Sequence, residues 1–153
     1  MCHEVIAYKM MEAAEAAKHL GYVCENISPK EFCDYMMGET YTCDKTMLND
    51  VLGSGLLMLH EVIEISELKK RGVQINNMTL TSCDKAVVYE AHLTATEYEI
   101  KYVLSRGDLT WIRLRLSHAR EWLKDENLPE NLVERLRSIV SWLSGLTASV
   151  DDV

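Results

Sequence analysis

The chain has 153 residues, of which 48% are hydrophobic and 26% are charged, and its formal net charge is −8 at pH 7. This composition is typical of a globular domain large enough to bury a core, and it excludes an intrinsically disordered chain. Two prolines and seven glycines leave little material for a turn-rich β sandwich or barrel. The acidic balance argues against nucleic-acid binding, which needs concentrated Lys and Arg, but it does not exclude a small nucleotide held through a metal.

The cysteines and the apolar runs indicate the cellular environment. Five cysteines, an odd number without a CxxC pair, favour reduced thiols over a secreted disulfide framework. The longest apolar run, Leu56–Leu59, is far shorter than the ~20 residues of a membrane span. The first residues also lack the cationic start of a signal peptide. We therefore expect a cytoplasmic protein with no membrane partner.

Glycines and prolines mark the ends of the predicted helices. Glycine after basic residues, as in Lys70-Arg71-Gly72, is typical of a helix C-terminus, and Pro29 and Pro129 are typical of the first helical position. These signals predict helices over residues 3–20, 29–37, 44–71, 80–106, 108–124 and 129–146, followed by an acidic tail over 147–153. The predicted fold is all-α. It is a single domain over residues 1–146, formed by an antiparallel bundle of four to five long helices and one short helix.

The apolar residues indicate how these helices pack. The predicted helix 44–71 has an apolar arc over about half of its circumference, so we expect it to be the central helix. Within it, Gly53-Ser54-Gly55 predicts close packing or a kink. The two C-terminal helices have narrow apolar seams with the spacing of bundle packing. The seams are Leu109, Ile112, Leu116, Ala119 and Leu123, and Leu132, Leu136, Ile139, Leu143 and Leu146.

Polar residues gather on the face of helix 44–71 opposite the apolar arc. His60, Glu64 and Glu67 fall within an arc of about 60°, and Glu61 lies about 60° beyond its edge. Carboxylates grouped on one face suit a hard cation such as Mg²⁺, which prefers oxygen ligands. The alternative interpretation is a solvated polar face without a ligand.

The stretch Leu59–Gly72 (LHEVIEISELKKRG) resembles the first metal-binding helix of the MazG-like nucleoside triphosphate pyrophosphohydrolases. The resemblance implies an all-α enzyme that holds Mg²⁺ with an ExxE pair and, on a following helix, an ExxD pair. Glu61 and Glu64 match the first pair. No ExxD pair occurs in the predicted helix 80–106.

A carboxylate from the following helix could still complete a metal site. If helices 44–71 and 80–106 form a hairpin about residue 76, Glu61 lies level with Glu90. We therefore predict a metal site, with Mg²⁺ as the candidate ion, built from Glu61, Glu64, Glu67 and Glu90. The Glu-x-x-His motif of ferritin-like di-iron proteins is absent.

The helix predicted at 108–124 carries a second stripe outside its apolar seam. Two tryptophans surround basic residues in this stripe, which consists of Trp111, Arg115, His118 and Trp122. Tryptophan and arginine are enriched at the centres of protein interfaces. The stripe predicts the contact surface of a homodimer, although tryptophans that cover the edge of the core explain the pattern equally well.

The general layout of the chain and Leu59–Gly72 also resemble a family of helical proteins from thermoacidophilic archaea. This resemblance implies a helical bundle with no assigned activity. Two functions stay open. The first is a helical protein that acts through self-association or protein–protein interaction, which the lack of a complete catalytic motif favours. The alternative is a divalent-metal-dependent nucleotide pyrophosphohydrolase that uses the carboxylate cluster.

Overall fold

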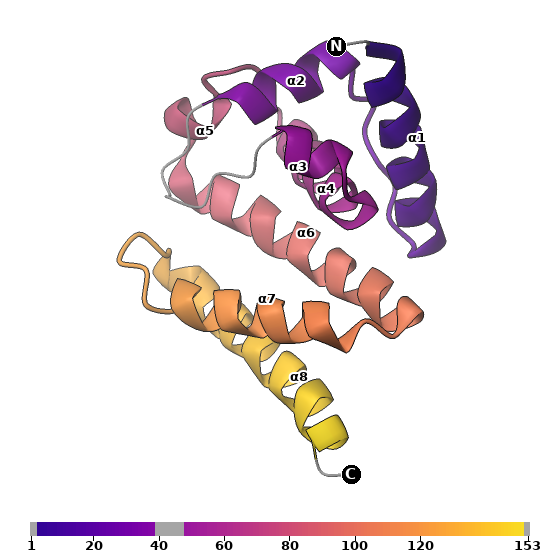
Figure 1. Cartoon of the computed structure of the whole chain (residues 1–153). Coiled ribbons are helices and arrows are strands. Elements are labelled where there is room, and N and C mark those ends of the chain that lie inside the picture. The colour runs from indigo at the N-terminus through magenta and orange to yellow at the C-terminus, as the bar shows by residue number, and fades with distance from the viewer. Residues whose placement is uncertain (1–2, 39–47, 152–153) are drawn as a thin grey trace. The chain divides into compact units, whose positions relative to one another are not determined.

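The computed structural model describes residues 3–38 and 48–151, and within these residues it is all-helical, without a strand (Figure 1). The elements, in chain order, are α1 (His3–His19), α2 (Pro29–Met37), α3 (Leu48–Leu52), α4 (Gly55–Lys70), α5 (Thr79–Ser82), α6 (Lys85–Arg106), α7 (Leu109–Trp122), the 3₁₀ turn η1 (Glu130–Leu132) and α8 (Val133–Asp151). The predicted all-α class is confirmed. Of the helices described, none combines the length and the apolar character needed to cross a membrane.

Several helix ends lie where the sequence signals predict them. Ser28 caps α2 and Pro29 takes its first position. Gly21, Gly72 and Gly107 have φ angles of 87°, 79° and 71°. Glycine adopts this left-handed conformation without the steric penalty that a Cβ atom imposes, so these residues end α1, α4 and α6.

The predicted helix 44–71 is divided in the structure. Its first part, α3, ends at Leu52, and α4 begins at Gly55, while residues 44–47 lie outside the described residues. The Ser54 hydroxyl accepts a hydrogen bond from the Leu57 N–H at 3.2 Å. A new N-cap therefore replaces the continuous helix at the glycine-rich sequence, because Ser54 satisfies a backbone donor that would otherwise lack a partner.

Two further boundaries differ from the prediction. The helix predicted at 80–106 consists of α5 and α6, because Cys83 is extended and the Asp84 carboxylate accepts a hydrogen bond from the Ala86 N–H at 2.9 Å. The predicted acidic tail begins at residue 147, but α8 continues through Asp151. Asp84 thus acts as a local helix start that the apolar pattern alone does not reveal.

The contacts divide the chain into two compact units, residues 1–99 and 100–153, where the sequence predicts one domain. In the first unit α4 is the central helix, as predicted: every residue from Met58 to Leu68 except Glu67 is buried. Helices α1 and α3 pack against it (Figure 1). The core joins side chains of α1, α2, α3, α4 and α6, among them Ile6, Met10, Phe32, Tyr35, Val51, Met58, Val62, Ile65, Leu68 and Ala91.

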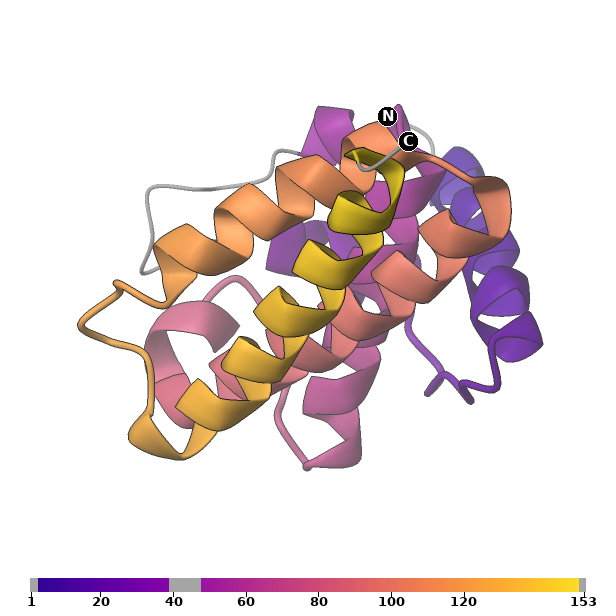
Figure 2. The ribbon, with the colours of Figure 1, turned by 90° about the horizontal axis from the view of Figure 1, so that it is seen from below.

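In the second unit, α7 packs along α8, which Figure 2 shows in orange and yellow. The buried residues are those of the predicted seams: Ile112, Leu116 and Ala119 on α7, and Leu132, Leu136, Ile139 and Leu143 from η1 and α8. The seam prediction is therefore confirmed for these positions.

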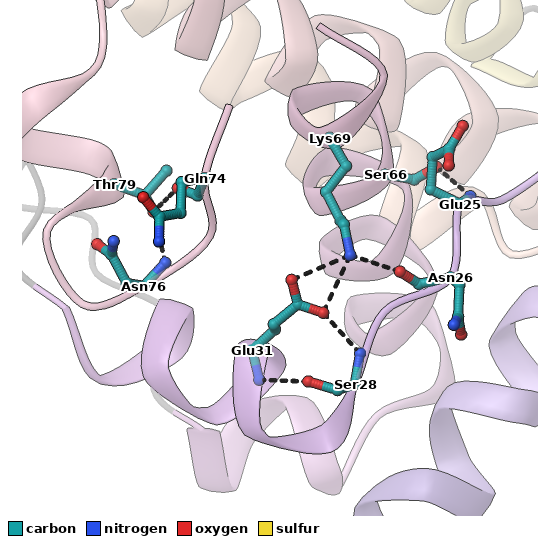
Figure 3. A network of polar contacts seen from close by, with 9 residues as sticks. All are labelled: Glu25, Asn26, Ser28, Glu31, Ser66, Lys69, Gln74, Asn76 and Thr79. Atoms are coloured by element: carbon teal, nitrogen blue, oxygen red, sulfur yellow. Dashed lines mark hydrogen bonds and ion pairs between the residues drawn. The ribbon is translucent and has the colours of Figure 1, made fainter. Parts of the chain in front are cut away.

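Polar contacts attach the segment before α2 to α4 (Figure 3). The Lys69 ammonium donates to both Glu31 carboxylate oxygens at 3.0 Å and to the Asn26 carbonyl oxygen at 2.5 Å. Glu31 also accepts from the Ser28 N–H at 2.9 Å, and the Ser28 hydroxyl accepts from the Glu31 N–H at 3.0 Å. Burial raises the pKa of the Glu31 carboxyl, but the Ser28 N–H and the Lys69 charge outweigh burial and hold that pKa below its ordinary value.

The substitution Glu31→Gln removes this charge and keeps a side chain that can still cap the helix. We expect it to lower the free energy of unfolding by ~0.5–1 kcal/mol at pH 7, a contribution typical of a partly exposed ion pair. A carboxyl with a lowered folded-state pKa contributes stability above its unfolded pKa of about 4.3, and this contribution is lost as the pH falls through the folded value. Urea titrations should therefore show a difference in the free energy of unfolding between Glu31→Gln and the unchanged chain at pH 7. This difference should become smaller at pH 3. The control is Glu134→Gln, since the Glu134 carboxylate is 83% exposed; an equal effect in both variants would contradict the prediction.

Candidate metal site

The polar face of α4 is buried. His60, Glu61 and Glu64 are 1%, 7% and 6% exposed. The solvated-face interpretation is therefore wrong for these three residues. A charged side chain is seldom buried without a partner. The partners of these residues therefore indicate what this face of α4 can bind.

Four side chains form a continuous series of polar contacts between α4 and α6. Glu99 Oε1 lies 2.9 Å from His60 Nδ1, His60 Nε2 lies 3.2 Å from His92 Nδ1, and His92 Nδ1 lies 3.0 Å from Glu64 Oε1. His60 and Glu64 are one turn apart on α4, and His92 and Glu99 are two turns apart on α6. Each pair therefore points from one face of its helix.

When the Glu99 carboxyl is ionised, its contact with His60 determines the tautomer of the neutral ring. Its carboxylate is fully buried and, when ionised, can only accept hydrogen bonds, so the hydrogen of a neutral His60 ring lies on Nδ1. The other ring nitrogen, Nε2, then presents a lone pair toward His92 and Glu64. A carboxylate behind a histidine in this way is the usual arrangement around a metal-bound histidine.

His92 Nδ1 is the atom at which the contacts from α4 converge. This nitrogen faces both His60 Nε2 and Glu64 Oε1. If His60 Nε2 is an acceptor, one hydrogen on His92 Nδ1 has to serve two acceptors. A cation between the three atoms would accept a lone pair from each of them.

The spacing of these three atoms suits a metal ion. The ligand atoms of His60, Glu64 and His92 all lie within 4.8 Å of one another, and no other group of three such side chains occurs in residues 3–38 and 48–151. With metal–ligand bonds of ~2.0–2.1 Å, tetrahedral ligands are about 3.3 Å apart. His92 Nδ1 lies 3.2 Å from His60 Nε2 and 3.0 Å from Glu64 Oε1, which is close to this value.

The second oxygen of Glu64 is held separately. The Tyr35 hydroxyl donates to Glu64 Oε2 at 3.0 Å, and burial together with the Glu64 and Glu61 charges raises the pKa of Tyr35 well above its ordinary value. Tyr35 therefore stays protonated and remains a donor. Burial raises the pKa of Glu64, but when the two histidine rings are protonated, the hydrogen bond and charge of His92 and the charge of His60 outweigh burial and lower that pKa to about 2. At neutral pH Glu64 is a carboxylate with Oε1 directed at the two histidines.

The structure brings together only part of the predicted carboxylate set. Glu61 interacts with Glu64 and contributes to lowering the pKa of Glu64. Glu67 accepts from the Tyr22 hydroxyl at 2.6 Å and lies 3.6 Å from the Lys70 ammonium. Glu90 pairs with Arg71 at 2.6 Å. The predicted residues thus occupy three environments, and the converging metal ligands include Glu64 alone among them.

Sequence reasoning missed His92 and Glu99 and did not assign His60 as a ligand. A signal for His92 was present in the predicted hairpin: a turn about residue 76 that places Glu61 level with residue 91 also places His60 level with His92. The prediction followed carboxylates and the Glu-x-x-His motif, whereas here His60 precedes Glu64 by one turn. Glu99 carries no sequence signal of its own, since its role depends on burial.

The predicted interface stripe lies on α7 in the second unit. Trp111 and Trp122 are half-buried and His118 is exposed. The Arg115 guanidinium lies 5.2 Å from the centre of the Trp111 ring, and its Nη1 lies 3.2 Å from His118 Nδ1. These contacts arrange the stripe within one chain, and a homodimer at this surface stays a prediction.

No protein-family model, curated protein or solved structure matches the chain.

The hydrogen bond from Tyr35 to Glu64 can be tested by Tyr35→Phe. The variant leaves one oxygen of a buried carboxylate without its donor, so we expect the metal-free protein to lose about 1–3 kcal/mol of unfolding free energy. Chemical denaturation in the presence of a chelator measures the loss. Tyr8→Phe is the matched control, because Tyr8 is 60% exposed on α1. Equal stabilities of the two variants would contradict a structural role for this hydrogen bond.

Proposed function

We propose that the protein binds a divalent transition-metal ion through His60 Nε2, Glu64 Oε1 and His92 Nδ1. The observation that carries the proposal is the convergence of these three ligand atoms within 4.8 Å, with Glu99 behind His60. The ligands come from α4 and α6, and both helices contribute apolar residues to the core of the first unit. Burial of the site lowers the competition from water, which strengthens the attraction between the ion and its ligands.

The donor set indicates the class of metal. Two imidazole nitrogens and one carboxylate oxygen suit Zn²⁺, Fe²⁺, Co²⁺ or Ni²⁺ better than Mg²⁺, which prefers oxygen ligands. The Glu61–Glu64 pair that resembles the MazG-like enzymes would favour Mg²⁺ if it acted alone. Since His60 and His92 contribute nitrogens beside Glu64, we place the transition metals first.

Thermal unfolding of the chelator-treated protein tests the proposal. At a free Zn²⁺ or Co²⁺ concentration of 100 times the dissociation constant, binding stabilises the folded state by about 2.7 kcal/mol, which corresponds to a rise in Tm of roughly 5–10 °C. His92→Gln should abolish most of this rise, since it removes one of three ligands from a half-exposed position. His118→Gln, which removes an exposed histidine from α7, should leave the rise unchanged.

Two outcomes would count against the proposal. If Zn²⁺ raises the Tm of His92→Gln and of the unchanged chain equally, the ion binds elsewhere. A shift with Mg²⁺ and nucleoside triphosphates alone, lost in Glu64→Gln but kept in His92→Gln, would instead support the metal-dependent nucleotide hydrolase.

Glu99 is expected to act as a positioning residue for His60. In Glu99→Gln the side-chain amide can donate to His60 Nδ1 and so favour the tautomer with hydrogen on Nε2, which blocks the ligand atom. We expect metal affinity to fall 10–100-fold, the usual effect of losing such a partner, measured by competition with a chromophoric chelator. Glu97→Gln removes a carboxylate from the same helix and should change affinity little. Unchanged affinity in Glu99→Gln would show that His60 needs no partner.

A further inference from the structure

We propose that the metal in this site keeps an exchangeable coordination position on the His92 side, which takes water or another small monodentate donor. The inference rests on the proposed function and concerns what the bound ion can do. A site closed by protein ligands would be structural, whereas an open one gives the ion access to an external ligand.

The number of donor atoms is the first argument. Glu64 directs Oε1 toward His92 at 3.0 Å, while Oε2 accepts a hydrogen bond from the Tyr35 hydroxyl at 3.0 Å. His60 can give only Nε2, because Nδ1 is bound to Glu99 at 2.9 Å. With Nδ1 of His92, the described residues 3–38 and 48–151 supply three converging donor atoms. Zinc takes four ligands, and Fe²⁺ or Co²⁺ can take up to six, so a further ligand is required.

The position of Glu61 is the second argument. Glu61 is a carboxyl group next to the site, since it interacts with Glu64. However, the converging group consists of His60, Glu64 and His92. On α4, Glu61 is rotated by about 100° from His60, whereas Glu64 is rotated by about 40°. Glu61 therefore lies beside Glu64, where its carboxyl can accept a hydrogen bond from a water on the metal.

Solvent access is the third argument. The His60 and Glu64 side chains are 2% and 7% exposed, while the His92 side chain is 37% exposed. An external ligand can therefore approach past His92 and not from the Glu99 or Tyr35 side. Water, hydroxide or a carboxylate oxygen is small enough to serve as this external ligand, and the ion would make bound water a better nucleophile for hydrolysis.

The test uses the full chain loaded with Co²⁺ and titrated with sodium azide, followed by visible absorption. Bound Co²⁺ should give ligand-field bands that the His92→Gln variant lacks. Azide should then shift these bands in a saturable manner, and the bands of Glu61→Gln should also respond to azide. Cobalt bands that do not respond to azide would overturn the inference and leave the proposed function intact.

Glu61→Gln separates the two ways in which the site could be built. If azide shifts the bands only in Glu61→Gln, Glu61 is the fourth ligand and the site is closed in the unchanged chain, which overturns the inference. If no cobalt bands appear in the unchanged chain, the proposed function itself fails. A shift in both proteins supports the exchangeable position.

Discussion

The hydrogen bond between His60 and Glu99 is the contact on which the polar interior of the first unit depends. Both side chains are almost fully buried, with 2% and 0% exposure. Neither would be tolerated there alone, since an unpaired ionisable group in a protein interior is strongly destabilising. Their pairing also determines which nitrogen of His60 faces Glu64 and His92. This one contact therefore satisfies two buried groups and leaves His60 Nε2 facing His92.

The same pairing explains why α4 can be buried on both sides. Val62 and Ile65 join the apolar core of α1, α2 and α3, while His60 and Glu64 point to α6. An apolar α6 surface opposite these residues would leave their polar atoms without partners. Since α6 presents His92 and Glu99 instead, the polar side of α4 forms a second, specific contact with α6. The register between α4 and α6 is thereby fixed by matched polar atoms as well as by packing.

Sequence patterns were sufficient for the parts of the fold that depend on local chemistry. Pro29 and the three left-handed glycines mark helix ends, and the apolar seams of α7 and α8 are the buried positions. At Gly53-Ser54-Gly55 the sequence predicts close packing or a kink but not a new helix start, and the division at Asp84 was not predicted. A single side-chain oxygen that caps a helix weighs little against a long apolar period. The burial of His60 and Glu64 was also missed. A helical wheel shows that they lie opposite the apolar arc, but only α6 shows that this side is covered.

The site shows in the same way why a carboxylate motif is an incomplete guide to metal chemistry. Glu61 and Glu64 have the ExxE spacing, yet only Glu64 converges with the histidines, and Glu67 and Glu90 pair with Tyr22, Lys70 and Arg71. Residue spacing along one helix determines which side chains point in the same direction. The residues on the second helix determine which donor atoms lie opposite them. A carboxylate opposite Glu64 would offer Mg²⁺ an oxygen site, whereas His92 places an imidazole nitrogen there, a donor that suits a softer ion. In the proposed site, the class of metal would therefore depend on the residue at position 92.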